Sequence, residues 1–217
     1  MQALSLNREL LGDLLDQELL PDLLRPEAIS GVEEEIRHLA EGYRARSAEE
    51  LAAILHDLGD LTTDEIVERC MGEGRAWLLQ LAAQGRALEV EVPTAQGAQR
   101  RWLSAEDYWR YRDGFGLPEQ PPIAIPHDLL EPHRTPETAR ETLLRVLTRT
   151  HGPLIREQML ARYAFPEDWL DQTLQEMVDT GHLVAGYLTP GASEKQWCDR
   201  RVLERIHRRT LSLLRRE

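Results

Sequence analysis

Apolar residues recur at helical spacing in two stretches of residues 1–45, NRELLGDLLDQELLPDLL and PEAISGVEEEIRHLAEGYR, and again after residue 46. Four apolar residues there follow the i, i+3, i+4, i+7 spacing of a helix that buries one face: Leu51, Ile54, Leu55 and Leu58. Ser47 and Glu50 have the spacing of a capping box, in which each side chain accepts a hydrogen bond from the other residue's backbone N–H. The pattern predicts a first helix that begins after Ser47 and ends at Gly59.

Two more helices are predicted directly afterwards. Thr62 and Glu65 have the spacing of a second capping box, which predicts a short helix through about Arg69. A third helix is expected over residues 74–83, because its apolar positions recur at helical spacing and Gly85 follows as a stop.

A hairpin is expected after the third helix. Residues 87–92 alternate apolar and charged side chains, as a half-buried strand does. Residues 93–99 are rich in turn formers, and residues 100–103 return as the partner strand. Ser104 is then expected to cap a closing helix to about Arg112.

The same order of elements recurs between His151 and Arg208. Thr135 and Pro136 are typical of a helix start, and an inward stripe follows at Leu143, Val146, Leu147 and Thr150. A short helix over 155–163 precedes a third helix, which Pro166 opens and Gly181 ends. Residues 182–188 and 195–198 are predicted to form the second hairpin.

Two matching copies predict tandem winged-helix units. The expected fold class is therefore mainly α with small β-hairpins (α+β), as tandem winged-helix domains preceded by a helical segment. The predicted division is an N-terminal helical segment (1–45), winged-helix unit 1 (46–116), a Pro-rich linker packed as an extended strap (117–135), winged-helix unit 2 (136–199) and an Arg-rich C-terminal helix (200–217).

Charge is distributed unevenly along the chain. The net charge is −12, and residues 1–70 alone hold 17 acids against 6 bases. Residues 200–217 carry seven arginines. This asymmetry indicates an acidic docking or solvating end and a basic end that could meet phosphate. Cys70 and Cys198 lie far apart without metal-ligand spacing, and are expected to be reduced core thiols. With no apolar run long enough for a membrane and no signal peptide pattern, a cytoplasmic location is expected.

Motifs of catalysis are missing from the sequence. It contains no GxxxxGK[ST] phosphate loop, no GxSxG and no HExxH. We therefore expect no catalytic, cofactor-binding or metal-binding residues in this chain.

The third helix of a winged helix usually enters the major groove, but neither copy suits that role. The second carries five carboxylates and no base, so it is expected to pack on protein, and the first is largely apolar with Arg75. The candidate nucleic-acid contacts are Arg75, Arg100, Arg101, Lys195, Arg205, Arg208 and Arg209. Trp102 and Trp197 could stack on a base, or could belong to the core at matched repeat positions.

Several segments resemble one family. The stretches LSLNRELLGDLL, LLRPEAISGVEEEI, LGDLTTDEIVERC, TRTHGPL and WCDRRVLERIHRRTLSLLRRE are similar to the large helicase-related (Lhr) superfamily 2 helicases of bacteria, in the region that follows the helicase core. The resemblance implies a fragment of an ATP-dependent 3′-to-5′ DNA helicase active in DNA repair. It also implies that ATP and magnesium bind only in motor domains outside this chain.

Three hypotheses remain open. The first is a non-catalytic accessory region that contributes to DNA binding or architecture, with single-stranded or forked DNA and other domains of the parent helicase as partners, and no membrane. The second is a protein-interaction or oligomerisation module, such as a homo-oligomer, without DNA contact. The third is part of a winged-helix DNA glycosylase-like fold.

Overall fold

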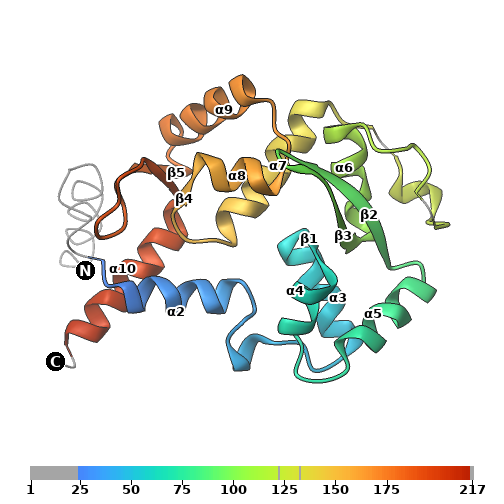
Figure 1. Ribbon diagram of the computed structural model, residues 1–217, viewed down its shortest axis with the longest axis horizontal. Helices are drawn as coiled ribbons and strands as arrows, with labels where there is room; N and C mark the ends of the chain where they lie inside the picture. The colour runs from blue at the N-terminus through green and yellow to red at the C-terminus, as the bar shows by residue number, and fades with distance from the viewer. Residues whose placement is uncertain (1–23, 122, 132, 216–217) are drawn as a thin grey trace, which may run out of the picture.

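The computed structural model describes residues 24–121, 123–131 and 133–215. The helical pattern predicted before Leu24 lies outside these residues. The first winged-helix unit contains α3 (Ala48–Leu58), β1 (Asp60–Leu61), α4 (Thr63–Glu68), α5 (Gly74–Ala83), β2 (Ala87–Thr94) and β3 (Gly97–Ser104). Its three strands pair antiparallel in the order β1-β3-β2 (Figure 1).

Unit 2 repeats this order. It contains α7 (Pro136–Arg149), β4 (Leu154–Ile155), α8 (Arg156–Arg162), α9 (Glu167–Asp179), β5 (Leu183–Gly186) and β6 (Gln196–Asp199), with strand order β4-β6-β5. Leu61 pairs with Trp102 in unit 1, and Leu154 pairs with Trp197 in unit 2. The α+β class and the tandem winged-helix arrangement predicted from the sequence are confirmed, with a hairpin after each stop glycine.

Local signals explain most element boundaries. The Thr62–Glu65 capping box is complete, since both reciprocal hydrogen bonds are present. At Ser47 only half of the box forms, because the Glu50 carboxylate accepts from the N–H of Arg46 instead. Gly59 ends α3 with φ of 90°, a conformation that favours glycine.

The closing helix of unit 1 differs from its prediction. A short 3₁₀ turn, η2 (Ala105–Asp107), comes before α6 (Tyr108–Phe115), and the Ser104 side chain makes no capping hydrogen bond. Ser104 is extended and the chain then tightens into the 3₁₀ turn, so the predicted cap is wrong.

The Pro-rich segment after α6 packs against the protein. Ile123, Ile125 and Leu130 contact the main core, and the Tyr108 hydroxyl donates to the carbonyl of Pro118 at 2.6 Å. A 3₁₀ turn, η3 (His127–Leu129), lies within it.

One hydrophobic core crosses both units. Side chains of β2, β3 and α6 share a cluster with those of α7, α8 and α9. The hairpin of unit 1 also bonds directly to unit 2: the N–H of Ala95 donates to Leu160 at 3.0 Å, and that of Ala164 to Pro93 at 2.8 Å. The two units therefore pack as one block.

A buried carboxylate joins the units at this seam. Asp60 of β1 is fully buried and accepts from Arg101 of β3 and Arg162 of α8, at 3.0 and 2.8 Å. The hydroxyls of Tyr111 and Tyr163 also donate to it. Burial alone would raise the pKa of Asp60, but the charges of Arg162 and Arg101 outweigh burial and lower it.

Helix α2 (Pro26–Ile36) packs against elements from the C-terminal part of the chain. It lies beside α10 (Arg200–Leu214), as Figure 1 shows, and the two share an apolar cluster with the β5–β6 hairpin. Glu35 accepts from Arg205 and from Arg209, both at 2.6 Å. A short 3₁₀ turn, η1 (Glu41–Tyr43), connects α2 toward α3.

Both cysteines are buried, as predicted for core residues, and neither forms a disulfide bond within the described residues. Within the described residues, no helix has the length and apolar composition needed to cross a membrane.

Candidate nucleic-acid interface

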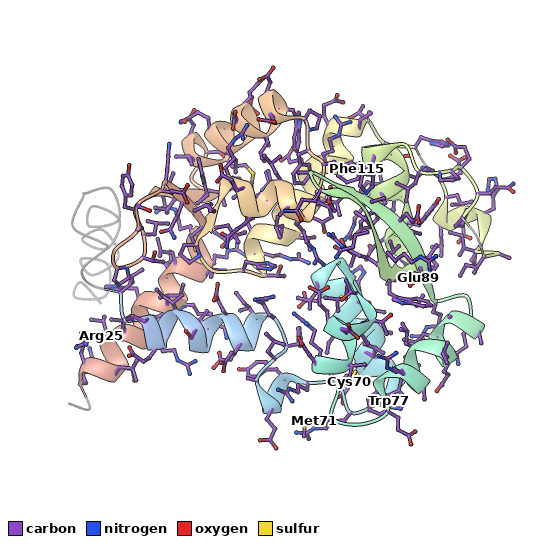
Figure 2. All side chains as sticks on the ribbon, in the orientation of Figure 1. Arg25, Cys70, Met71, Trp77, Glu89 and Phe115 are labelled. Carbon is purple, nitrogen blue, oxygen red and sulfur yellow. The ribbon has the colours of Figure 1, made fainter. Side chains whose placement is uncertain are left out.

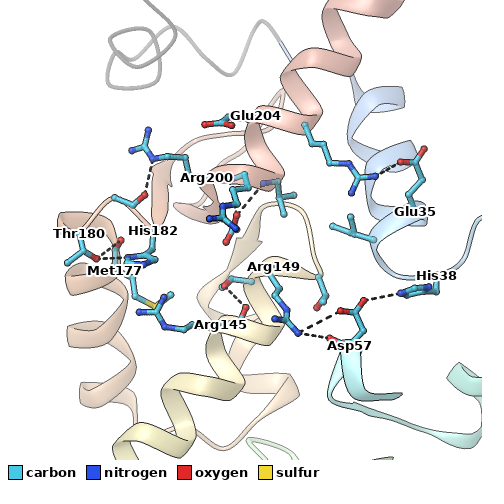
Figure 3. A pocket seen from close by; sticks show the side chains of 18 of the residues that line it. Glu35, His38, Asp57, Arg145, Arg149, Met177, Thr180, His182, Arg200 and Glu204 are labelled. Carbon is cyan, nitrogen blue, oxygen red and sulfur yellow. Dashed lines mark hydrogen bonds and ion pairs between the residues drawn. The ribbon is translucent and has the colours of Figure 1, made fainter. Parts of the chain in front are cut away.

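A hollow of about 860 Å³ opens between α2, the end of α3 and unit 2 (Figure 3). We name it the seam groove. Five arginines line it, together with four carboxylates and other side chains: Arg145, Arg149, Arg200, Arg201 and Arg205, with Glu35, Asp57, Asp199 and Glu204. Because arginine presents a planar fork of donors, such a lining suits phosphate oxygens.

Helix α7 supplies two of these arginines. Arg145 and Arg149 are one helical turn apart, so they share a face, while Leu143 and Leu147 point into the core. Arg145 pairs with Glu141 at 2.7 Å, and both are about two-fifths exposed. Arg149 is half exposed; it donates to the backbone carbonyl of Asp57 at 3.2 Å and lies 3.7 Å from its carboxylate.

The start of α10 supplies the others. Asp199 caps the helix by accepting from the backbone N–H groups of Arg201 and Val202. Arg200 donates to a neutral acceptor, the carbonyl of Gly181, at 2.9 Å. The Arg201 side chain is exposed, and its guanidinium has no ion-pair partner in the described part of the chain.

Basic side chains bind two of the four acidic side chains of the groove, Glu35 and Asp57. Burial opposes ionisation of Glu35, yet hydrogen bonds from Arg209 and Arg205 lower its pKa. The Nε2–H of His38 donates to the carboxylate of Asp57 at 3.0 Å; this hydrogen bond lowers the pKa of Asp57 and raises that of His38. Arg200 and Arg201 are the two groove arginines that form no ion pair among the described residues, although Asp199 and Glu204 lie near them on the chain.

The third helices offer no comparable surface. On α5, Leu79 is 64% exposed and Arg75 is the outward charge, 3.4 Å from Asp64. On α9, the acidic residues face solvent, and Arg156 of α8 pairs with Glu167 and Asp171. The acidic helix was predicted to pack on protein, but its acidic face is open within this chain.

The arginines that the sequence predicted as nucleic-acid contacts lie on separate surfaces of the structure. Arg205 lines the seam groove, whereas Arg209 is bound to Glu35 outside the lining and Arg208 is exposed on α10. Arg75 and Arg100 are exposed on unit 1, away from the groove lining.

Arg101 requires a correction. Only 1% of it is exposed, and its guanidinium binds Asp60, Gln99 and the carbonyl of Arg162. The alternation of strand β3 placed it on the inner face, where it joins the two units instead of meeting a ligand.

The strand tryptophans are half-buried. Trp102 packs on the core of unit 1 and donates to the hydroxyl of Thr63 at 3.1 Å. Trp197 packs on the main core, with the ammonium of the exposed Lys195 5.3 Å from its ring centroid. Both fit the core alternative better than base stacking.

The sequence prediction missed Arg145, Arg149, Arg200 and Arg201 as a group. Their signal was present in part: two arginines at i, i+4 on the polar side of a predicted helix, and two more just after a strand. The sequence could not show which other elements these two helix faces would lie against.

The described residues contain no group of His, Cys, Asp and Glu side chains suited to a metal ion.

Comparison with known proteins matches residues 22–132 to the family model of the large helicase-related protein, winged-helix domain. A protein of Mycolicibacterium smegmatis named Lhr helicase and probable uracil glycosylase is 35% identical over 98% of this chain. One of Escherichia coli named Lhr helicase and uracil glycosylase is 31% identical, also over 98%. The chain spans only 14% and 13% of the lengths of these relatives.

Proposed function

Because this chain belongs to the winged-helix family of large helicase-related proteins, we propose that it is a non-catalytic accessory region of an ATP-dependent DNA helicase. In this proposal its seam groove binds the sugar-phosphate backbone of single-stranded or forked DNA. The observation that carries it is the convergence of five arginines from α7 and α10 on one groove. ATP and magnesium would bind in motor domains outside the chain.

Backbone contact fits the groove better than base-pair readout. Sequence-specific winged helices insert a polar or basic third helix into the major groove, and here one is apolar outside and the other acidic. Single strands need a basic track and a few stacking surfaces. Tyr43, which lines the groove and is 45% exposed, could stack on one base.

Salt dependence of DNA binding tests the proposal. The chain is titrated against a fluorescent single-stranded oligonucleotide at several salt concentrations, as wild type and as the double variant Arg149→Gln/Arg201→Gln. Each lost phosphate contact should reduce the slope of log Kd against log salt by about 0.7, so the double variant should lose about 1.4.

The matched control removes the same charge elsewhere. Arg75→Gln/Arg100→Gln should keep the wild-type slope, because both residues lie outside the groove. Equal loss of slope in both double variants, with both folded by circular dichroism, would refute the groove as the binding surface.

A protein-interaction role is the second candidate, favoured by one observation. Val67, Met71 and Leu79 expose apolar surface on or next to α4 and α5. If this patch mediates self-association, sedimentation should show concentration-dependent dimers that salt does not dissolve and that Leu79→Gln abolishes. A sedimentation profile of a monomer at all concentrations would rule out the homo-oligomer hypothesis.

The names of both relatives also include a uracil glycosylase. A part of a glycosylase-like fold is therefore the third candidate. The accessory-region proposal expects this chain to release no uracil from a uracil-containing oligonucleotide, and release by the isolated chain would overturn it.

A further inference from the structure

Two arginines occupy equivalent positions in the two units. Leu61 and Leu154 make the same strand pair in their sheets, and eight residues further on, at the end of the second helix, lie Arg69 and Arg162. Their surroundings are opposite.

Arg162 is fully compensated. It donates to Asp60 at 2.8 Å and to Glu65 at 3.1 Å. Burial alone would lower the pKa of Arg162, but the charge of Asp60, with that of Glu65, raises it above its ordinary value.

Arg69 lacks such a partner. Its side chain is only 2% exposed, and its Nη1 donates to the backbone carbonyl of Glu65 at 2.8 Å. The carboxylate of Glu68, which is mostly exposed, is 4.0 Å away, and the charge of Glu65, whose carboxylate binds Arg162, also acts on Arg69. Its Nε is buried and has no hydrogen-bond partner among the described residues. Burial lowers the pKa of Arg69 to about 10. A buried guanidinium without a bonded anion is unfavourable, and usually marks a missing counter-ion or water.

Arg37 carries a second unpartnered donor. It follows α2 directly and is partly exposed, but its Nε is buried without a hydrogen-bond partner among the described residues, and its positive charge acts on Arg69. Backbone hydrogen bonds hold the segment after α2 against Arg69: the N–H of Ala45 donates to its carbonyl at 2.8 Å. We name Arg37 and Arg69 the junction pair, since α2, unit 1 and unit 2 meet there.

The buried imidazole of His151, in unit 2, lies close enough to the junction pair for the charges of both arginines to act on it. Its Nδ1 lies 3.0 Å from the carbonyl of Leu147, which assigns the proton to Nδ1 and leaves Nε2 as an acceptor. Burial first, and then the charge of Arg37, lower the pKa of His151 to about 4; Arg162 and Arg69 act in the same direction. The acidic groups nearby are Glu33, which accepts from the N–H of Gly152 at 3.1 Å, and Glu65, which Arg162 occupies.

We propose that the junction pair binds a small phosphate-class oxyanion. Each of these two cationic side chains has a buried Nε–H donor without a partner among the described residues, and a bound oxyanion would supply the missing acceptor and counter-charge. The neighbours Ile36, His38 and Thr150 line the seam groove, so the anion would enter from the groove floor. This inference does not depend on DNA binding by the groove.

Phosphate titration of the whole chain tests the site directly. At constant pH and ionic strength, replacing chloride by phosphate at about 100 times its Kd should raise the melting temperature by roughly 5 °C. An anion beside His151 favours the imidazolium, so phosphate should raise the pKa of His151, measured by NMR, by about one unit or more. Neither response in the native chain would overturn the proposal.

Variants separate the site from general charge effects. Arg37→Gln should weaken phosphate binding at least tenfold, whereas Arg46→Gln, which removes an equal charge from an exposed position in the same segment, should not. Equal weakening by both variants would also overturn it. Because the NMR readout uses the native chain, a poorly folded Arg37→Gln would not remove the test.

Competition identifies the source of the phosphate. If a strand end supplies it, a 5′-phosphorylated oligonucleotide should displace inorganic phosphate and its unphosphorylated counterpart should not. If a free anion supplies it, neither oligonucleotide should displace it, and the phosphate-induced change in melting temperature should remain. Displacement by the unphosphorylated oligonucleotide as well would overturn a phosphate-selective site.

Discussion

The two winged-helix units share one order of elements and differ wherever a side chain leaves the core. The outward face of α5 is apolar around Leu79, while that of α9 is acidic. At the end of the second helix, Arg162 is bound by two carboxylates and Arg69 by none at hydrogen-bond distance. Figure 2 shows the side chains of both units as sticks on the ribbon. The comparison teaches that the repeated pattern of buried apolar residues determines the shared fold. The residues that differ, on the outward faces and where the units meet, determine what each unit can bind.

The largest loss in the free energy of unfolding is expected for a substitution of Asp60. Unit 2 has Pro153 at the matching position. Asp60→Asn would leave Arg101 buried without its counter-charge, and removal of one partner from a buried pair costs about 3–5 kcal/mol. Urea unfolding should report this loss. Glu49→Gln, which breaks the exposed pair with Arg86, should leave the urea midpoint almost unchanged. Equal effects of the two substitutions would show that the seam network does not join the units.

The next effect is a pH dependence that comes from His151 of unit 2, whose matching position in unit 1 is Leu58. The pKa of His151 falls from its ordinary value of 6.5 to about 4, so the unfolded chain takes up this proton first as pH falls. The stability that neutral His151 provides is complete above pH 6.5 and is lost between pH 6.5 and 4, by about 3 kcal/mol.

His151→Leu installs the residue that unit 1 carries at the equivalent position, Leu58. In phosphate-free buffer, the variant should lose less stability than wild type between pH 6.5 and 4. Parallel stability curves for the two proteins would contradict the assignment of this pH dependence to His151.

A smaller effect is expected at the surface ion pairs of α9. Arg156 binds Glu167 and Asp171 in solvent, and hydrogen bonds from Arg156 lower the pKa of Asp171. Arg156→Gln should destabilise the chain by no more than about 1 kcal/mol, because exposed pairs are screened. A loss as large as that of Asp60→Asn would show that the acidic helix depends on this arginine.

The smallest effect is expected for DNA binding by the third helices. Neutralising α9 with Asp168→Asn/Glu176→Gln should change the Kd for single-stranded DNA less than twofold at physiological salt. An increase of tenfold or more in affinity would mean that α9 lies against the DNA, and that the two third helices are more alike in function than their surfaces suggest.

The fold was largely predictable because its signals are local. Helical spacing, the Thr62–Glu65 capping box and the stop glycines lie within a few residues of the elements they define. The two-residue strands β1 and β4 escaped prediction, because strands so short have no period. The site was less predictable. Arg101 and Arg100 are neighbours with the same side chain. Strand alternation turns them to opposite faces, but only the tertiary partner Asp60 shows that the face of Arg101 is the buried one.

Photo-crosslinking to single-stranded DNA tests the central claim most directly, that the seam between the units and not a third helix meets nucleic acid. A thiothymidine-containing oligonucleotide is crosslinked to the whole chain, and the attached peptides are identified by mass spectrometry. We predict crosslinks in α7 and the start of α10, around Arg149 and Arg201, that disappear at high salt. Crosslinks confined to α5 and the β2–β3 hairpin would contradict it.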